Sequence, residues 1–391
     1  MNCLIVTHNF PRFESDLPGN FILRLLRNFR ECRPFVVAPW SRGVAVRERY
    51  GQIEVRRFRY AVPPLPEIAY RGEMQKLAFK SPMHFTSLAL LSLSMMNSAF
   101  SMAGNVEVVN AHWLVPAGLL SAPVSLLKNR PLVITMHGTD SVLFSKFHRF
   151  LNLKSRIFMN LKAITVVSSF IAESIKPFVP ENVEVKVVPM PVEDEIFDPS
   201  LRAKVNPEYD VVYVGRITRQ KNVDGLIKAV DLLRKDYGYP ARLLIVGDGP
   251  HRPRLMELVD QLGLRSLVDF RGRVRPSDVP FEMARGRVIA LLSYREGFGL
   301  SVLEGMKMGL PQVGSDDGGI RDIVLDGVTG FLVPPDDPRA AAEALFRLLS
   351  DDSLYSTMSE RSIERGKTVF SARSLSKKFE DILLKAASTS K

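Results

Sequence analysis

Short apolar runs rich in β-branched residues alternate with helix-period segments along the chain, and this alternation restricts the fold more than any other feature. Residues 1–190 hold six such runs, including CLIVTH and PLVITMH, and the remainder holds six more, including DVVYVG and RVIALLS. Unbroken apolar runs of this length are typical of strands buried on both faces of a parallel sheet. Helical segments are predicted between the runs, for example over residues 21–29 and 116–127, the second with a proline at its start. This alternation of strands and helices predicts an α/β protein built from doubly wound sheets.

Two domains fit the chain length of 391 residues, since a domain usually takes about 100–200 residues. A proline-spaced, acid-rich stretch without periodicity follows the sixth run, and it predicts a linker near residues 197–207. We therefore expect one domain over 1–197, a second over 198–370, and an amphipathic C-terminal helix over 371–391.

Charge and cysteine content indicate the kind of partner and the cellular compartment to expect. Residues 1–190 hold 23 Lys/Arg and 12 Asp/Glu, so the formal net charge of +11 belongs to this half. An anionic partner is expected there: nucleic acid, a membrane surface or a phosphorylated substrate. The two cysteines, Cys3 and Cys32, predict a reducing compartment without a disulfide framework. The run after Met1 lacks a basic leader and a cleavage site, so no secretory signal is expected.

One uncharged segment, residues 85–103, approaches the length of a membrane crossing. On a helix its polar residues gather on one side, opposite Leu and Met, and a lipid-spanning helix has no need of such a stripe. The pattern favours a buried or surface helix, with contact to a membrane left open. The polar residues are Ser87, Ser94, Asn97, Ser98 and Ser101.

Open parallel sheets bind ligands beyond the carboxyl ends of their strands, so the turns after strands are the places to search. The first turn, THNFPRFESDLPGNF, reaches a helix through Pro18 and Gly19, and a glycine before a helix start can admit an anion. A plain loop explains Gly19 equally well. The dinucleotide fingerprint G-x-G-x-x-G is absent from this turn, which argues against an ordinary dinucleotide-dependent oxidoreductase.

Basic residues follow a strand in VGRITRQKN. Arg216 and Lys221 lie five positions apart beside a predicted helix start, where two cations are unfavourable unless an anion lies between them. A guanidinium fork and an ammonium together suit a diphosphate. Solvent-exposed Arg and Lys remain the simpler alternative. A third turn, FRGRV, places Gly272 where the backbone can approach a flat group closely.

REGFGLSVLE is the fourth turn, with glutamates at 296 and 304 on either side of a Gly-Phe-Gly sequence. Glycine-flanked amides at a helix start can hold phosphate, and carboxylates accept hydrogen bonds from sugar hydroxyls. A nucleoside diphosphate that carries a sugar would use both. Alternatively, Ser301 and Glu304 form a capping box, which explains Glu304 without any ligand.

These segments, together with VNAHWLVPAGL and TMHGTD, resemble glycosyltransferase family 4 over nearly the whole chain. Members are retaining enzymes of the GT-B fold, with two Rossmann-like domains facing each other across a cleft. The resemblance implies an N-terminal acceptor domain and a C-terminal nucleotide-sugar domain, with the last helix crossing back to the first.

The resemblance also implies residue roles. Glu304 would bind the donor ribose, Arg216 and Lys221 the diphosphate, and Glu296 the donor sugar. His137 would face that sugar from the front domain, with Asp140 a weaker candidate. The catalytic candidates are therefore His137, Glu296, Arg216 and Lys221, and the donor-binding candidates are Gly19, Gly272, Gly297, Phe298, Gly299, Leu300 and Glu304.

The implied reaction moves a sugar from a UDP- or GDP-linked donor to an acceptor hydroxyl with retention of configuration. No metal or other cofactor is expected, because the sequence lacks an Asp-x-Asp pair and basic residues would take the place of the ion. The basic front half favours a lipid-linked or glycan acceptor in cell-envelope or surface polysaccharide synthesis, at the cytoplasmic face of a membrane.

Three other functions fit parts of the same pattern. A nucleotide-sugar epimerase of the same fold would share the diphosphate site, and a glycoside hydrolase would use the two glutamates but not Arg216 or Lys221. A basic nucleic-acid or membrane-binding module would explain the front half alone. The expected partners are therefore a nucleotide sugar, an acceptor and an anionic membrane surface, and nucleic acid is not expected.

Overall fold

A computed structural model describes residues 1–13, 16, 19–70, 74, 80–138, 140 and 153–389. The chain divides into two compact units, which are Met1–Pro191 with Ala372–Lys391, and Val192–Ser371. The sequence analysis predicts these boundaries between residues 197 and 198 and between residues 370 and 371. Residues 192–197 lie in the second unit, where Lys307 Nζ donates a hydrogen bond to Val192 O at 3.0 Å and pairs with Asp194.

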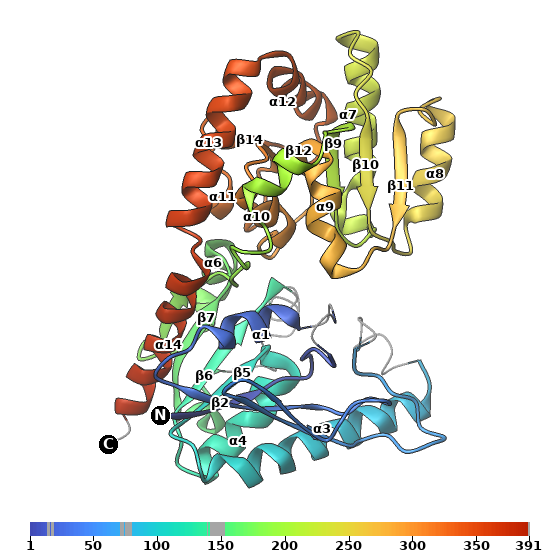
Figure 1. Cartoon of the computed structure of the whole chain (residues 1–391). Helices are drawn as coiled ribbons and strands as arrows, with labels where there is room; N and C mark the ends of the chain where they lie inside the picture. The colour runs from blue at the N-terminus through green and yellow to red at the C-terminus, as the bar shows by residue number, and fades with distance from the viewer. Residues whose placement is uncertain are drawn as a thin grey trace. The chain divides into compact units, whose positions relative to one another are not determined.

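An eight-stranded sheet forms the centre of the first unit, in the order β3-β4-β2-β1-β5-β6-β7-β8 (Figure 1). All neighbouring strands are parallel except the pair β3–β4. The strands are β1 (Asn2–Val6), β2 (Arg33–Pro39), β3 (Arg47–Tyr50), β4 (Ile53–Phe58), β5 (Val108–His112), β6 (Leu132–Met136), β7 (Leu161–Val166) and β8 (Glu184–Val187).

The hairpin β3–β4 was not expected from the sequence. Its strands are short and alternate in burial, so they lack the long apolar run that marks the buried strands. The hairpin turns at Gly51 and Gln52, beside the amino end of β4.

Two pairs of helices pack on this sheet. α3 contacts β1, β2 and β4 and lies next to α4, whereas α14 contacts β5, β6 and β7 and lies next to α1. The helices are α1 (Asn20–Arg27), α3 (Pro82–Ala103), α4 (Leu119–Leu127), α6 (Ser169–Ile175) and α14 (Ala372–Ser388), with 3₁₀ turns η2 (Arg156–Phe158) and η3 (Lys176–Phe178).

The start of α4 differs from expectation. The sequence predicted a helix from Pro116, but an irregular turn, η1 (Leu114–Gly118), precedes it because Val115 has the strand-like angles φ −123° and ψ 124°. The helix itself begins at Leu119.

α3 is a surface helix whose exposed side carries both apolar and polar residues, and Asn97 and Ser101 are among the exposed ones. Ser87 is buried and donates a hydrogen bond to Met83 O at 3.0 Å, whereas Phe85 is 56% exposed and Leu93 is 59% exposed. Ser87 can be buried because a backbone oxygen of the helix accepts a hydrogen bond from its hydroxyl.

α14 is held to the first unit by a buried carboxylate. Glu380 is 2% exposed, and its Oε1 accepts hydrogen bonds from the backbone N–H groups of Arg30, Glu31 and Cys32 at 2.9, 2.8 and 2.7 Å. A carboxylate that accepts several amide hydrogen bonds is a favourable way to bury a charge. The stretch between α1 and β2 therefore depends on a residue about 350 positions later.

The second unit has a six-stranded parallel sheet in the order β11-β10-β9-β12-β13-β14. The strands are β9 (Tyr209–Val214), β10 (Leu243–Val246), β11 (Val268–Gly272), β12 (Gly286–Leu291), β13 (Gln312–Ser315) and β14 (Gly330–Val333).

Helices contact this sheet along its length: α7, α9 and α12 lie against β12, and α10 lies against β12 and β13. They are α7 (Val223–Asp236), α8 (Arg252–Gln261), α9 (Val279–Ala284), α10 (Leu300–Lys307), α11 (Ile320–Ile323), α12 (Pro338–Ser350) and α13 (Asp352–Thr368), with 3₁₀ turns η4 (Pro199–Lys204), η5 (Arg219–Lys221) and η6 (Pro276–Asp278).

Candidate functional site

Three histidines meet at the carboxyl edge of the first sheet. The neighbouring strands β1, β5 and β6 end at or just before His8, His112 and His137. The Trp113 ring lies against two of them, with centroids 4.5 Å from His8 and 4.4 Å from His137. Strand order therefore brings residues about 130 positions apart into one aromatic cluster.

Hydrogen bonds fix this cluster. His112 Nδ1 lies 3.1 Å from His137 Nε2. Asp140 does not contact either ring through a hydrogen bond; its Oδ2 accepts from His137 N at 2.7 Å and its Oδ1 accepts from Leu114 N at 3.0 Å. Asp140 therefore holds the loops after β5 and β6 together, and the histidines interact with each other.

Burial shifts every titratable group in the cluster. It lowers the pKa of His8 to about 4 and that of His112 to about 3. The pKa of His137 falls well below its usual value, first through burial and then through the nearby His112 and His8. Burial raises the pKa of Asp140 to about 7, against the hydrogen bonds from backbone amides. The histidines are therefore neutral near pH 7.

Gly19 has a packing reason of its own. It precedes α1 with φ +75°, and a Cβ placed there would lie 2.2 Å from Asn9 O. No side chain fits, which explains the glycine without a ligand. The helix that it starts places the Phe21 ring 5.0 Å from the His137 ring. Pro18, which the sequence singled out with Gly19, lies outside the described residues.

Three glycine-containing loops pack on one another at the carboxyl edge of the second sheet. A Cβ on Gly247 would lie 1.9 Å from Gly215 O, and one on Gly249 would lie 2.1 Å from Ile217 O. Gly247 N also donates a hydrogen bond to Gly272 O at 2.8 Å. Backbone therefore approaches backbone along the ends of β9, β10 and β11.

Lys221 and Glu296 form an ion pair within this edge. Their Nζ and Oε2 atoms lie 2.5 Å apart, and both side chains are mostly buried. Gln220 joins the same two loops, because its backbone oxygen accepts from Tyr294 N at 2.8 Å. The sequence predicts an anion beside Lys221, and the carboxylate of Glu296 occupies that position.

The backbone around Glu296 is unusually constrained. Arg295 has φ +46° and its N–H donates to Asp317 Oδ2 at 2.8 Å. Gly319 N donates to Glu296 O at 2.7 Å, and a Cβ on Gly318 would lie 2.4 Å from that oxygen. Backbone strain of this kind persists where the surroundings fix it, often at functional sites.

The Gly-Phe-Gly turn leads into α10 without a capping box. Gly299, with φ +101°, is the N-cap of the helix. Phe298 is buried, and its ring centroid lies 6.2 Å from that of Phe370. Ser301 lies inside the helix, so the capping-box alternative is wrong. A glycine cap leaves the first amides of α10 without a side-chain acceptor.

The candidates of the second unit thus share one sheet edge. Gly297, Phe298 and Gly299 are buried in the turn before α10, Leu300 is its first residue, and half-buried Glu304 lies one turn later. Gly272, with φ +75°, ends β11. Arg216 is exposed, and its backbone oxygen accepts from buried Tyr213 Oη at 3.1 Å.

Sequence reasoning missed several members of both edges. It did not single out His8, His112 or Trp113, although each follows an apolar strand-like run and together they would have marked one edge. It also missed Asp317 and Gly318, which lack a distinctive motif.

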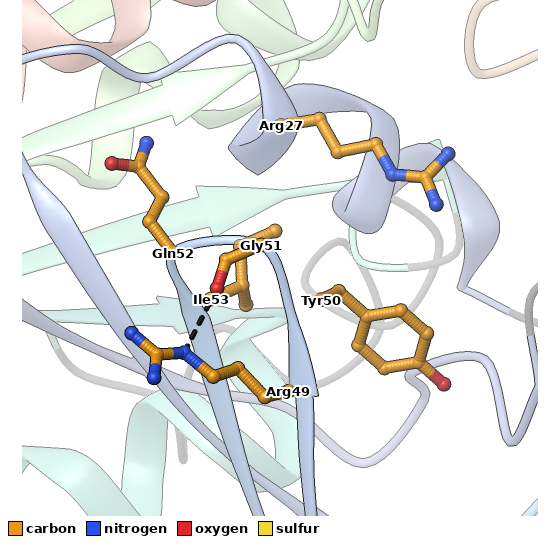
Figure 2. A pocket seen from close by; sticks show the side chains of 6 residues that line it. All are labelled: Arg27, Arg49, Tyr50, Gly51, Gln52 and Ile53. Carbon is orange, nitrogen blue, oxygen red and sulfur yellow. Dashed lines mark hydrogen bonds between the residues drawn. The ribbon is translucent and has the colours of Figure 1, made fainter.

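A cavity of about 420 Å³ lies elsewhere in the first unit. Figure 2 shows its lining, with Arg27 from α1 and Arg49 to Ile53 from the hairpin β3–β4. The hairpin turn lies at the amino end of β4, and ligands of such sheets bind at the carboxyl ends. This cavity therefore does not belong to the candidate site. Among the described parts of the chain, no group of three or more His, Cys, Asp or Glu could hold a metal ion.

Comparison with known proteins agrees with this geometry. Residues 195–365 match the family described as glycosyl transferases group 1. N-acetyl-α-D-glucosaminyl L-malate synthase of Bacillus anthracis is 25% identical over 71% of this chain and 74% of its own length. An α-1,4-N-acetyl-D-galactosaminyltransferase of Campylobacter jejuni, named for a diphospho-undecaprenol-linked substrate, is 30% identical over 61% and 64%.

Solved structures agree over nearly the full chain. Sucrose-phosphate synthase of Thermosynechococcus elongatus aligns with a TM-score of 0.79 at 20% identity over 99% of both chains. HepE of Anabaena, in complex with UDP, aligns with a TM-score of 0.72 at 18% identity over 98% of this chain and 100% of its own. The expected GT-B fold is confirmed, residues 195–365 match the glycosyl transferases group 1 family, and the protein is a glycosyltransferase.

Proposed function

We propose that the protein transfers a sugar from a nucleoside diphosphate to an acceptor hydroxyl with retention of anomeric configuration. The observation that carries this proposal is the Lys221–Glu296 ion pair beside the uncapped amides of α10. These groups supply, at one sheet edge, a cation and N–H donors for phosphate and a carboxylate for sugar hydroxyls. UDP in the HepE structures supports a nucleotide ligand for this fold.

Individual roles follow from the chemistry of each group. Arg216 and Lys221 would stabilise the diphosphate as it leaves, Gly297 to Leu300 would bind phosphate, and Glu296 would bind the sugar. Glu304 would bind the ribose, and the base would meet backbone near Gly272. In this proposal the cations stabilise the leaving group without a metal ion, and His137 is the catalytic candidate within the first unit.

Thermal unfolding with UDP, GDP and ADP and their sugars tests the donor site. A ligand at 100 times its Kd stabilises the folded protein by about 2.7 kcal/mol. We expect a rise in Tm with one nucleotide that is absent in Glu304→Ala and in Lys221→Ala. No rise with any nucleotide would contradict the donor site. With the donor known, the product's anomeric configuration separates retention from inversion, and formation of an isomeric nucleotide sugar without acceptor would indicate an epimerase.

We further propose a lipid-linked or glycan acceptor and peripheral contact with the cytoplasmic face of a membrane, with envelope or surface polysaccharide as the product. The observation that supports membrane contact is α3, the one helix of the described residues that is long and apolar enough to span a bilayer. Only 28% of its apolar window is buried, and Phe85, Leu93 and Phe100 are exposed by 40% or more. The lipid-linked substrate named for the Campylobacter relative supports such an acceptor.

Charge supports the same surface. From residue 80 to residue 172 the acidic residues are Glu107 and buried Asp140. Lys128 Nζ lies 3.8 Å from the centre of the Phe100 ring, so a cation borders the apolar face. Exposed apolar residues beside basic ones are typical of helices that bind anionic lipid surfaces. The described basic residues of this stretch are Lys80, Lys128, Arg130, Lys154, Arg156 and Lys162.

Sedimentation with vesicles tests this surface separately from catalysis. We expect the protein to pellet with phosphatidylglycerol vesicles and not with phosphatidylcholine vesicles. The variant Phe85→Ser/Leu93→Ser should lose binding, whereas Met256→Ser, which changes an exposed apolar residue of the second unit, should not. Equal binding of all three proteins would contradict the proposed contact.

A further inference from the structure

The His112–His137 hydrogen bond raises a question that its length alone does not answer. The two ring nitrogens lie 3.1 Å apart, and one must donate while the other accepts. The direction decides which nitrogen of His137 carries its proton, and therefore what that side chain can do for a ligand.

Both rings are neutral at physiological pH, because burial holds each pKa below its usual value. Each ring therefore carries one N–H. The other titratable groups of the cluster do not change this count: Asp140 accepts from backbone amides, and His8 is itself kept neutral by burial. The proton of each ring is placed by the hydrogen bond between them.

The surroundings of the two outer nitrogens differ. His112 is fully buried, and its Nε2 has no hydrogen-bond partner among the residues that the structure describes. His137 retains 8% exposure. If His137 Nε2 donated, the proton of His112 would move to Nε2 and become a buried N–H without an acceptor. Such orphaned donors are rare in folded proteins, because a buried N–H without an acceptor loses its hydrogen bond to water and gains none.

In the other arrangement, His112 Nδ1 donates to His137 Nε2. The buried Nε2 of His112 is then an unprotonated nitrogen, in a ring that stacks on Phe379 with the two centroids 6.1 Å apart. The proton of His137 is placed on Nδ1. No N–H group of the pair is then buried without an acceptor.

We infer that His112 is a positioning residue that fixes His137 in the Nδ1–H tautomer, so that His137 offers a neutral hydrogen-bond donor at the edge of the first unit. The ligand atom that it meets must be an acceptor, such as a sugar hydroxyl oxygen. This inference gives a chemical role to His137 within the proposed sugar transfer, on which its catalytic meaning rests.

The tautomer can be measured without any substrate. In protein labelled with ¹⁵N-histidine, long-range proton–nitrogen correlation shows which ring nitrogen carries the proton. We expect Nδ1–H for His137 and for His112 near pH 7. An Nε2–H tautomer at His137 in the unmodified protein would overturn the inference, whatever the activity.

Matched variants test the catalytic meaning. An asparagine amide lies near the position of histidine Nδ1 and a glutamine amide near that of Nε2, so His112→Asn keeps the donor and His112→Gln does not. We expect His112→Asn to retain the Nδ1–H signal of His137 and most of kcat. His112→Gln and His112→Leu should lose the signal and lower kcat at least about tenfold, with a smaller change in donor KM, since a wrong histidine tautomer is costly in catalysis.

The outcomes separate this inference from the proposed function. Loss of the Nδ1–H signal without loss of kcat would overturn the positioning role while donor-induced stabilisation still supports the transferase. Equal loss of kcat in His112→Asn and His112→Leu, with near-ultraviolet circular dichroism like that of the unmodified protein, would show that the donor at Nδ1 is not what matters.

Discussion

The two strand-end edges of this protein share one architecture and differ in chemistry. Both lie where parallel strands of a doubly wound sheet end. The first gathers uncharged rings: Trp113 lies against His8 and His137, and His137 also contacts His112. The second gathers backbone and charge, with Lys221 paired to Glu296. The fold thus provides the location, and the residues at the strand ends provide the chemistry.

Burial accounts for much of the difference. In the first edge burial keeps the histidines neutral, so their contribution to the free energy of unfolding depends on pH. In the second edge Lys221 and Glu296 lie beside each other, and their attraction offsets the cost of removing both charges from water. Acid is therefore expected to destabilise mainly the first edge. Substitution of charged residues is expected to affect mainly the second edge.

The largest effect is expected from the ion pair. Glu296→Ala and Lys221→Ala should each lower the transfer rate about 10²–10³-fold, the usual cost of losing one group that stabilises a reacting centre. The double variant should lose little more than either single one, because the two side chains act together. Steady-state kinetics on the three variants checks this.

A matched control is Lys235→Ala, which removes an exposed lysine of α7 from its ion pair with buried Asp231. Its rate should match that of the unmodified protein. An additive loss in the double variant would mean that Lys221 and Glu296 serve separate functions.

Acid should destabilise the first unit selectively. The folded pKa values of His8 and His112 lie below the ordinary value of 6.5, so their stabilising contribution is complete above about pH 6.5 and is lost as pH falls toward 4 and 3. Each such histidine contributes up to about 1.4 kcal/mol per pH unit in this window. The pKa of Asp140 is raised to about 7, so its contribution to stability increases as the pH falls and offsets the loss from one histidine.

Both tryptophans, Trp40 and Trp113, lie in the first unit, so tryptophan fluorescence during urea unfolding reports on that unit. The free energy of unfolding should fall between pH 7.5 and pH 5, and the fall should be smaller in His112→Asn. An unchanged dependence on pH in that variant would indicate that His112 is not buried and neutral.

Glycines of the second unit should differ by their surroundings. Gly318 and Gly327 have φ of +72° and +70°, but a Cβ on Gly318 would meet Glu296 O at 2.4 Å, whereas a Cβ on Gly327 would meet nothing within 4 Å. Gly327→Ala should cost about 1–2 kcal/mol of stability through its backbone angle alone. Gly318→Ala should cost more and also raise the donor Kd, which calorimetric titration measures. Equal donor affinity in both variants would show that the Gly318 contact does not position Glu296.

The smallest effect is expected at Ser301. Because Gly299 caps α10, Ser301→Ala should change the unfolding free energy by less than about 0.5 kcal/mol, as at an ordinary surface site. A loss near 1 kcal/mol, measured by urea unfolding, would restore the capping box.

Much of the fold was predictable because buried parallel strands leave long apolar runs. The hairpin β3–β4 was not, since its strands alternate and its first strand, RERY, is polar. The helix start at Leu119 was hidden by a proline that normally begins helices.

The candidate site was predictable in part. Lys221 and Glu296 lie 75 positions apart, yet both follow parallel strands, so their meeting at one edge could be expected. The identity of the carboxylate that pairs with Lys221 could not be predicted, because it depends on the turns at Arg295 and Gly318. The histidine cluster depends on the order β1-β5-β6, which no local pattern determines.

The carboxylate of Glu380 also affects the order in which the protein can be completed during synthesis. The first unit is translated early, but the amides of Arg30 to Cys32 obtain their acceptor only when α14 leaves the ribosome. Until then, the first unit lacks a helix that contacts β5, β6 and β7. The second unit, continuous from Val192 to Ser371, can fold before the first is finished. The part of the chain that is made first is therefore the last to become complete.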